Sequence, residues 1–216
     1  MVAAAAATPT ATAESGVPRA SPKVGQILQA ARAIFMREGY GAASMDAIAR
    51  EANVSKATLY AHFSGKEALF AAVIRHRCAQ LAWTHLDDET WRSSPADGLR
   101  RIGRDFCDLI FTPETLAIYR VVVSEAPRFP ELGRVFYDMG AARARQRLAD
   151  FLAQAARSGA LRIPDPLLAA EQFIGMLFGH FHLPRVLGLI ERPSDHEIDT
   201  VVDLAVGLIM RGYAAD

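Results

Sequence analysis

The side chains with the clearest chemical capability lie between Ser44 and Glu67, where hydroxyl groups stand at the start of short helical patterns. Ser44 and Ser55 are each placed to cap a helix by accepting a hydrogen bond from a main-chain N–H three residues later. Asn53, between the two patterns, tolerates the left-handed backbone that a sharp turn requires. Two short helices separated by such a turn predict a helix-turn-helix, whose second helix, from Lys56 to about His62, enters the DNA major groove.

The flanking elements must hold this motif in place. Pro22 opens a run of apolar residues at helical spacing that stops at Gly39, and this helix is expected to pack behind the motif. Ser64 and Glu67 have the spacing of a capping box and open a further helix that reaches about Leu86. Residues 1–21 are rich in Ala, Thr and Pro, which favours a disordered tail.

The composition is that of a globular chain. Of the 216 residues 51% are hydrophobic, and no stretch approaches about 18 uninterrupted apolar residues, so we expect a buried core and no membrane span. Cys78 and Cys107 have neither metal-ligand spacing nor a disulfide framework, and the N-terminus lacks a secretory pattern. Both features suit a reducing cytoplasm.

The net charge of zero hides a split along the chain. Residues 23–80 carry eight Lys and Arg against four Asp and Glu, whereas residues 81–216 carry fifteen against nineteen. The basic part contains the helix-turn-helix, which fits a polyanion-binding unit joined to an acidic body. An excess of four charges by itself is also compatible with chance.

Every segment after Pro95 has helical periodicity and none alternates like a strand, which predicts an all-α fold. The last two helices, at about residues 167–183 and 198–209, have apolar stripes too wide for one buried side. We expect the second side to be a subunit interface, where two helices from each chain form a four-helix bundle. The alternative is a pair of central core helices in a monomer. The residues expected at the interface are Phe181, Val201, Val202, Ala205, Leu208 and Ile209.

Three motifs carry a family resemblance: AxxxFxxxGY over residues 31–40, SMDAIAREANVSKATLYAHF over 44–63 and SGKEALF over 64–70. With them, residues 23–74 resemble the TetR family of transcriptional regulators. The resemblance implies a three-helix DNA-binding domain joined by a long helix to an α-helical ligand-binding and dimerisation domain. We expect the tail over residues 1–21, the DNA-binding domain over 22–68 and the second domain over 69–216.

The resemblance also assigns DNA contacts position by position. It implies that Ser44 and Tyr60 meet phosphates, that His62 lies at the groove edge, and that Lys66 clamps a phosphate at the positive end of its helix. Ala57 is placed to approach a thymine methyl. A packed histidine is the alternative for His62. The full set of expected DNA contacts is Ser44, Ser55, Lys56, Ala57, Thr58, Tyr60, His62 and Lys66.

Residues 112–140 resemble the ligand-binding domain of the AefR-like subgroup, which implies a small-molecule pocket between the middle helices. Few buried charges are expected there, so a mostly apolar or aromatic effector is favoured. His180 and His182, two apart on a helix, do not face one metal ion, and we expect neither a metal nor a cofactor. The alternative for each candidate is an ordinary core position. The candidate lining residues are Phe106, Tyr119, Phe136, Phe173, Met176, Phe178 and His180.

These observations favour a homodimeric, ligand-responsive repressor on double-stranded, palindromic operator DNA, with half-sites about 34–36 Å apart or a multiple of that spacing. A helical enzyme with a nucleic-acid-binding head is the second hypothesis. The sequence lacks a nucleophile elbow, a GxGxxG or P-loop and an HExxH pair, which disfavours an enzyme. A dimeric architectural protein without an effector is the third.

Overall fold

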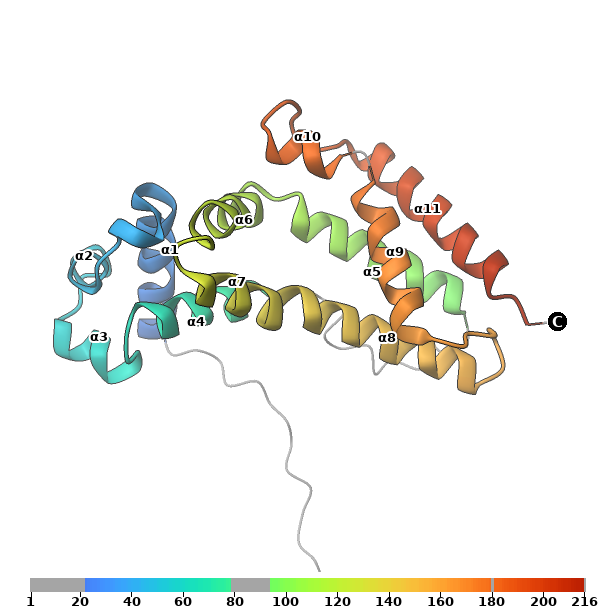
Figure 1. The fold of residues 1–216 in the computed structure, drawn as a ribbon, viewed down its shortest axis with the longest axis horizontal. Helices are drawn as coiled ribbons and strands as arrows, with labels where there is room; N and C mark the ends of the chain where they lie inside the picture. The colour runs from blue at the N-terminus through green and yellow to red at the C-terminus, as the bar shows by residue number, and fades with distance from the viewer. Residues whose placement is uncertain (1–21, 79–93, 180, 216) are drawn as a thin grey trace, which may run out of the picture.

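The computed structural model describes residues 22–78, 94–179 and 181–215, and over these ranges the chain is helical (Figure 1). The predicted all-α fold is confirmed. The tail over residues 1–21 and the expected helix end near Leu86 lie outside the described residues. The elements are α1 (Pro22–Ala42), α2 (Met45–Glu51), α3 (Lys56–His62), α4 (Lys66–Cys78), α5 (Pro95–Ile110), α6 (Pro113–Glu125), α7 (Pro130–Phe136), the π-helix η3 (Tyr137–Ala141), α8 (Ala142–Arg157), α9 (Pro166–Phe178), α10 (His182–Val186) and α11 (Asp195–Gly212).

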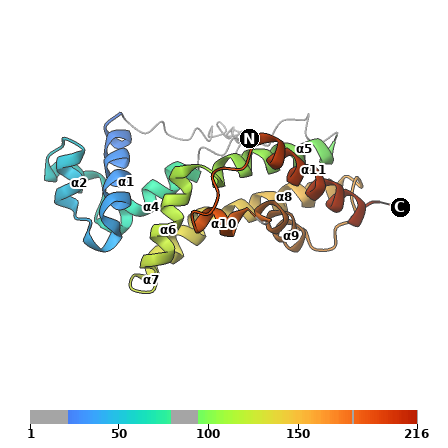
Figure 2. The ribbon, with the colours of Figure 1, turned by 90° about the horizontal axis from the view of Figure 1, so that it is seen from above.

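Helices α1–α4 form a head at one end of an elongated molecule, and α5–α11 form the body (Figure 2). The head core is built on fully buried side chains such as Phe35, Leu59 and Phe70. Two body helices, α6 and α7, contribute Ile118 and Leu132 to this core. Helix α4 runs across the boundary expected after residue 68 and packs in the head core. The expected domain boundaries remain a prediction.

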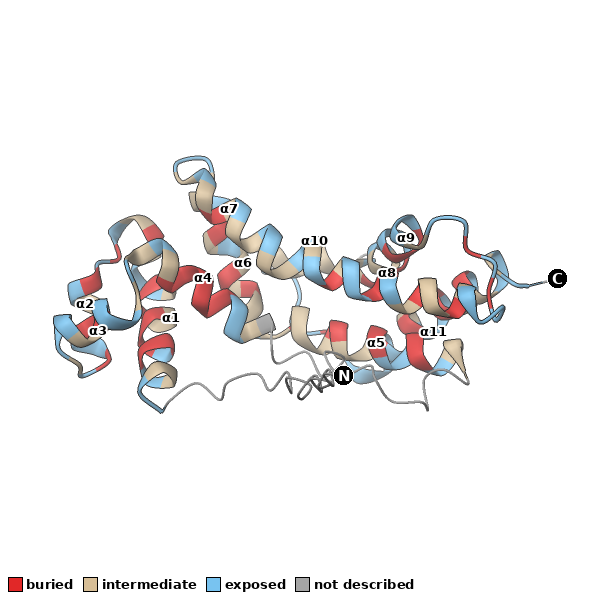
Figure 3. Cartoon of the chain, turned by 90° about the horizontal axis from the view of Figure 1, so that it is seen from below, coloured by how far each residue is buried: buried red, intermediate tan, exposed pale blue. Residues whose placement is uncertain are grey.

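A second core holds the body together, and its residues come from α5, α8, α9 and α11. Leu99, Leu148 and Phe173 are fully buried in it. Buried and exposed residues alternate along these helices, so that each helix has a buried side and an exposed side (Figure 3). Apolar burial of this kind is the main stabilising contribution in a helical domain.

Two glycines interrupt helices. Gly39 has φ +76° and ψ 165°, a conformation open mainly to glycine, at the position where the sequence predicts a stop. Gly179, with φ +45°, ends α9 after Phe178. The expectation of one helix up to Leu183 is therefore wrong past Phe178, because the left-handed backbone at Gly179 turns the chain before α10 begins.

The helix expected from Pro130 onward is continuous through α7, η3 and α8, but its centre is not α-helical. Tyr137–Ala141 adopts a π-helix, a rare form in which the hydrogen bonds skip one extra residue. Gly140 and Ala141 of this segment line the body cavity described below. Periodicity alone did not predict the local change of pitch.

Candidate functional site

The head places α3 as the sequence predicts. Ser44 caps α2 by accepting the Ala47 N–H at 3.1 Å, and Ser55 caps α3 by accepting the Thr58 N–H at 3.0 Å. Asn53 has φ +49°, which gives the left-handed turn between the two helices. The two caps define where α2 and α3 begin, and with the turn at Asn53 the local geometry is that of a helix-turn-helix.

One side of α3 is anchored and the other is open. Leu59 is fully buried in the head core, whereas Ala57, His62 and Tyr60 are exposed, Tyr60 by 52%. Lys56 is exposed too, and its Nζ donates to Asp46 Oδ2 of α2 at 2.6 Å. An exposed ion pair of this kind contributes about 0–1 kcal/mol, so a phosphate can replace the carboxylate at little cost. The open side of α3 therefore presents the polar groups that a DNA groove requires.

Lys66 lies in a different environment from the one expected. Its ammonium donates to three main-chain carbonyl oxygens, those of Tyr40 at 2.7 Å and of Gly41 and Ala43 at 3.1 Å. It also lies 4.5 Å from the centroid of the Tyr40 ring and 5.8 Å from that of Phe129. An ammonium has three N–H donors, and three carbonyls face it here. The structure thus gives Lys66 a role in holding the end of α1 to α4.

Burial shapes the ionisation of this joint. It lowers the pKa of Lys66, and the nearby Glu125 and Glu131 carboxylates act in the opposite direction. Burial also raises the pKa of Tyr40 to about 12, so its ring stays neutral beside the ammonium. Phe129, from the turn between α6 and α7, packs on Tyr40 with ring centroids 5.3 Å apart. This joint is a direct contact between the head and the body.

The body contains a cavity of about 220 Å³, lined by residues of α4 to α10 and of η3. Its aromatic lining includes four of the residues expected in a pocket, Phe106, Tyr119, Phe136 and Phe178. The rings meet edge to face: Phe106 contacts Phe178 at 5.6 Å, and Tyr119 contacts Phe136 at 6.0 Å between centroids. The cavity can therefore accept a small, mostly apolar molecule.

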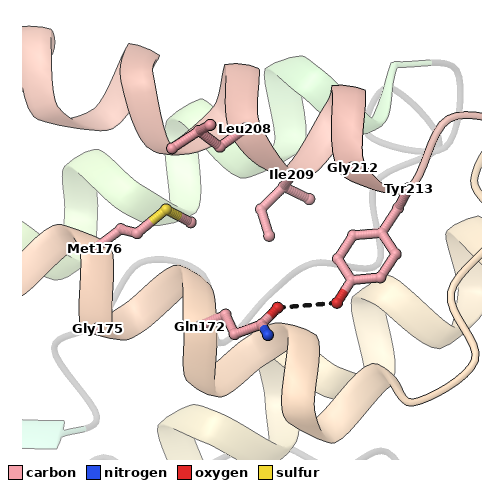
Figure 4. A pocket seen from close by; sticks show the side chains of 7 residues that line it. All are labelled: Gln172, Gly175, Met176, Leu208, Ile209, Gly212 and Tyr213. Atoms are coloured by element: carbon pink, nitrogen blue, oxygen red, sulfur yellow. Dashed lines mark hydrogen bonds between the residues drawn. The ribbon is translucent and has the colours of Figure 1, made fainter.

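Two of the other pocket candidates, Phe173 and Met176, lie elsewhere. Phe173 is fully buried in the body core, away from the cavity, because its side of α9 packs on α5 and α11. Met176 lines a depression on the outer face of α9 and α11 (Figure 4). His180 lies outside the described residues. The prediction that Phe173 and Met176 line the cavity is therefore corrected. Apolar spacing shows that one side of a helix is buried, but it does not show which neighbouring helix covers that side.

The lining residues that were not expected there include two with ionisable heads, His182 and Arg77. The His182 ring packs 4.5 Å from Phe178 and 5.1 Å from Tyr119, and burial lowers its pKa below the ordinary 6.5. No sequence signal singled out Arg77, because its place in the cavity depends on the contact between α4 and α6. Within the described ranges, no group of three or more His, Cys, Asp and Glu residues is arranged to hold a metal ion.

Most of the residues expected at a subunit interface are buried within the chain. Val202, Ala205 and Ile209 are buried in the body core, and so is Phe181, which packs on Phe111. These residues are corrected from interface to core positions, because they face α5 and α9 of the same chain.

The outer face of α11 carries other apolar residues. Leu208 is 53% exposed and Leu204, which was not predicted, is 62% exposed, while Val201 is half-buried beside them. Leu208 lines the depression shared with α9 (Figure 4), where Tyr213 donates a hydrogen bond to Gln172 at 2.9 Å. Exposed leucines one helical turn apart form an apolar strip open to a partner.

None of the helices in the described ranges combines the length and apolarity needed to cross a membrane. Comparison with known families matches residues 27–73 to the bacterial regulatory proteins of the tetR family. Residues 97–215 match the C-terminal domain of AefR-like transcriptional repressors. The two matches cover the head and the body in turn.

Two curated relatives match a short part of the chain. The HTH-type transcriptional activator FasR of Mycolicibacterium smegmatis is 49% identical over 57 residues, 26% of each chain. The HTH-type transcriptional regulator UidR of Escherichia coli K12 is 49% identical over 55 residues, 26% of this chain and 28% of UidR. The match thus spans about a quarter of the length of these relatives.

Solved structures match over nearly the whole chain. The flavonoid-responsive regulator FrrA is 34% identical with a TM-score of 0.74, covering 89% of this chain and 97% of FrrA. A TetR-family regulator from Mesorhizobium loti is 29% identical with a TM-score of 0.74, covering 91% and 98%. A TetR regulator from Agrobacterium tumefaciens is 26% identical with a TM-score of 0.76, covering 91% and 96%. The chain therefore belongs to the TetR family of DNA-binding transcriptional regulators and carries an AefR-like C-terminal domain.

Proposed function

We propose that this regulator is a homodimeric repressor that acts in the cytoplasm and leaves a palindromic operator when a small, mostly apolar effector fills the body cavity. The observation that carries the proposal is the arrangement of α3, with Leu59 locked in the core and Tyr60, Lys56 and Ala57 open to solvent. A rigid helix with one polar open side suits the major groove. We propose Ser44, Ser55, Lys56, Ala57, Thr58, Tyr60 and His62 as the DNA-contacting set.

A second copy of the chain is the proposed occupant of the outer α9–α11 face. Exposed Leu204 and Leu208 and the depression beside Met176 support this assignment. Two such faces related by a twofold axis would bring four helices together and shield the leucines from water. The same axis would place two α3 helices on successive turns of one face of DNA, about 34–36 Å apart.

The effector is proposed to be a compact aromatic molecule. An engineered cavity of about 150 Å³ lined by apolar residues binds benzene, so a cavity of about 220 Å³ has room for a somewhat larger ring system. The name of FrrA, a flavonoid-responsive regulator of the same fold at 34% identity, supports an aromatic class of ligand. Effector binding can release DNA only if the ligand prefers the conformation that does not fit the operator.

Footprinting on the DNA upstream of its own gene tests operator binding. We expect a palindromic protected site with the half-site spacing given above. Tyr60→Ala should weaken binding to all sequences, because a phosphate contact carries no base information. Tyr137→Ala, at an exposed site on η3 of the body, is the matched control and should bind normally. Absence of protection by the wild-type protein would overturn the proposed operator.

A thermal-shift screen of small aromatic compounds separates this proposal from an architectural protein without an effector. A ligand at 100 times its Kd should stabilise the fold by about 2.7 kcal/mol. Ala144→Leu, which places extra carbons in the cavity wall, should reduce that shift. Ala160→Leu, at an exposed position, should leave it unchanged. A screen in which no compound stabilises the wild-type protein would favour the architectural alternative.

A further inference from the structure

Arg77, near the C-terminal end of α4, contacts α6 and also lines the cavity of the body. Its Nη2 donates to Thr112 Oγ1 at 2.6 Å and its Nε donates to Thr115 Oγ1 at 3.2 Å. Thr112 is the N-cap of α6, so these bonds fasten the end of α4 to the start of α6. Arg77 also lines the cavity, and its side chain is only 21% exposed. The side chain that holds two helices together is thus within reach of a bound molecule.

The Arg77 end of the cavity is electropositive. Arg77 is the one formally charged side chain among the described residues that line the cavity, and His182 stays neutral at pH 7 because burial lowers its pKa. The N-terminus of α6, a helix of 13 residues, adds partial positive charge next to Thr115. Among the described residues, the carboxylate of Glu114 lies 4.0 Å from Nη2, and it is 44% exposed to screening water. The remainder of the lining is mostly aliphatic and aromatic.

We infer that Arg77 selects effectors that carry a carboxylate on a compact aromatic body. This inference rests on the proposed function, because it names the ligand class of the same cavity. A carboxylate accepts two parallel N–H bonds from a guanidinium, a stronger arrangement than bonds to neutral hydroxyls. A bound carboxylate therefore replaces the threonine hydroxyl oxygens as the acceptor of the Arg77 N–H bonds. The proposal does not require a free N–H donor on Arg77 before the ligand binds.

The exchange also gives the ligand a route to the head. A carboxylate that takes the Arg77 donors removes the bonds that tie α4 to Thr112 and Thr115 of α6. The other end of α4 packs in the head core through Leu69 and Phe70. Releasing α4 from α6 at the cavity frees the helix that positions the head. An apolar molecule of the same shape fills the cavity without loosening this link.

The test compares 2-naphthoate with 2-methylnaphthalene, which has the same ring system and a neutral group of similar size. Binding to the full-length protein is followed by naphthalene fluorescence. Wild type should bind 2-naphthoate at least tenfold more tightly than 2-methylnaphthalene. Arg77→Gln should lose that preference through a tenfold or greater loss for the acid, with less than a threefold change for the hydrocarbon. Arg75→Gln, which removes an exposed arginine of the same helix, should behave as wild type.

Arg77→Lys keeps the test decisive if the glutamine variant does not fold. A lysine retains the charge but not the planar pair of donors. Arg77→Lys should therefore prefer 2-naphthoate to 2-methylnaphthalene, but by a smaller factor than wild type does. Equal binding of both probes by wild type would overturn the role of Arg77 and leave the proposed apolar cavity intact. Binding of neither probe would overturn the carboxylate inference and count against the proposed effector site as well.

Discussion

Removing the Lys66 ammonium distinguishes a structural joint from a DNA clamp. In Lys66→Met the side chain keeps its length and apolar stem but loses the three N–H groups that meet the carbonyls of Tyr40, Gly41 and Ala43. Hydrogen bonds to a charged group contribute about 1.5–3 kcal/mol each when buried. Lys66 is only partly buried and water can replace some of the lost donors, so we expect a total destabilisation of about 2–4 kcal/mol.

Two measurements on the same variant separate the roles. Urea unfolding reports the free energy of unfolding, and fluorescence anisotropy with labelled operator reports the salt dependence of binding. A phosphate contact contributes about −0.9 to the slope of log K against log salt concentration. If Lys66 serves the joint, Lys66→Met lowers stability and leaves this slope unchanged.

Lys56→Gln is the matched control. Lys56 is 65% exposed and its bond to Asp46 lies at the surface, so we expect a stability change within about 0.5 kcal/mol. If Lys56 contacts a phosphate, Lys56→Gln should reduce the magnitude of the slope of log K against log salt concentration by about 0.9. The reasoning about Lys66 is refuted if Lys66→Met keeps wild-type stability and loses about 0.9 of the salt slope, since that pattern belongs to a phosphate clamp.

Three further results are expected. Leu208→Glu places a charge on the exposed strip of α11 and should convert a dimer into a folded monomer in light scattering; an unchanged mass would exclude this strip from the interface. Gly98→Ala puts a Cβ 2.5 Å from Phe151 Cζ, so urea unfolding should show a loss of about 1–3 kcal/mol, whereas Gly25→Ala, with open space around its Cβ, should gain up to about 1 kcal/mol. His182 is protonated near pH 6.5 in the unfolded chain and only at lower pH in the folded chain, so the free energy of unfolding should fall as the pH drops from 8 to 5. His182→Gln should lose less stability over the same range, and equal losses would contradict a buried neutral imidazole.

Local sequence signals were enough to predict the helix-turn-helix of the head. The side chains of Ser44 and Ser55 and the left-handed backbone at Asn53 act over three or four positions, so their spacing predicts the local structure that is observed. The all-α class followed in the same way from apolar periodicity. Such signals are local, and tertiary contacts did not need to be known to interpret them.

The tertiary structure decided what each apolar or charged side chain meets. Periodicity marked a wide stripe on α11, but only the packing of α5 and α9 buried Ile209 and left Leu208 in solvent. Lys66 lies within a capping pattern next to the DNA-binding motif. Its three acceptors, however, come from the end of α1 and the residue after it, more than twenty positions earlier. Arg77 lines the cavity because α6 lies beside α4. Neighbours that are distant in sequence set these environments, and one-dimensional spacing contains no information about them.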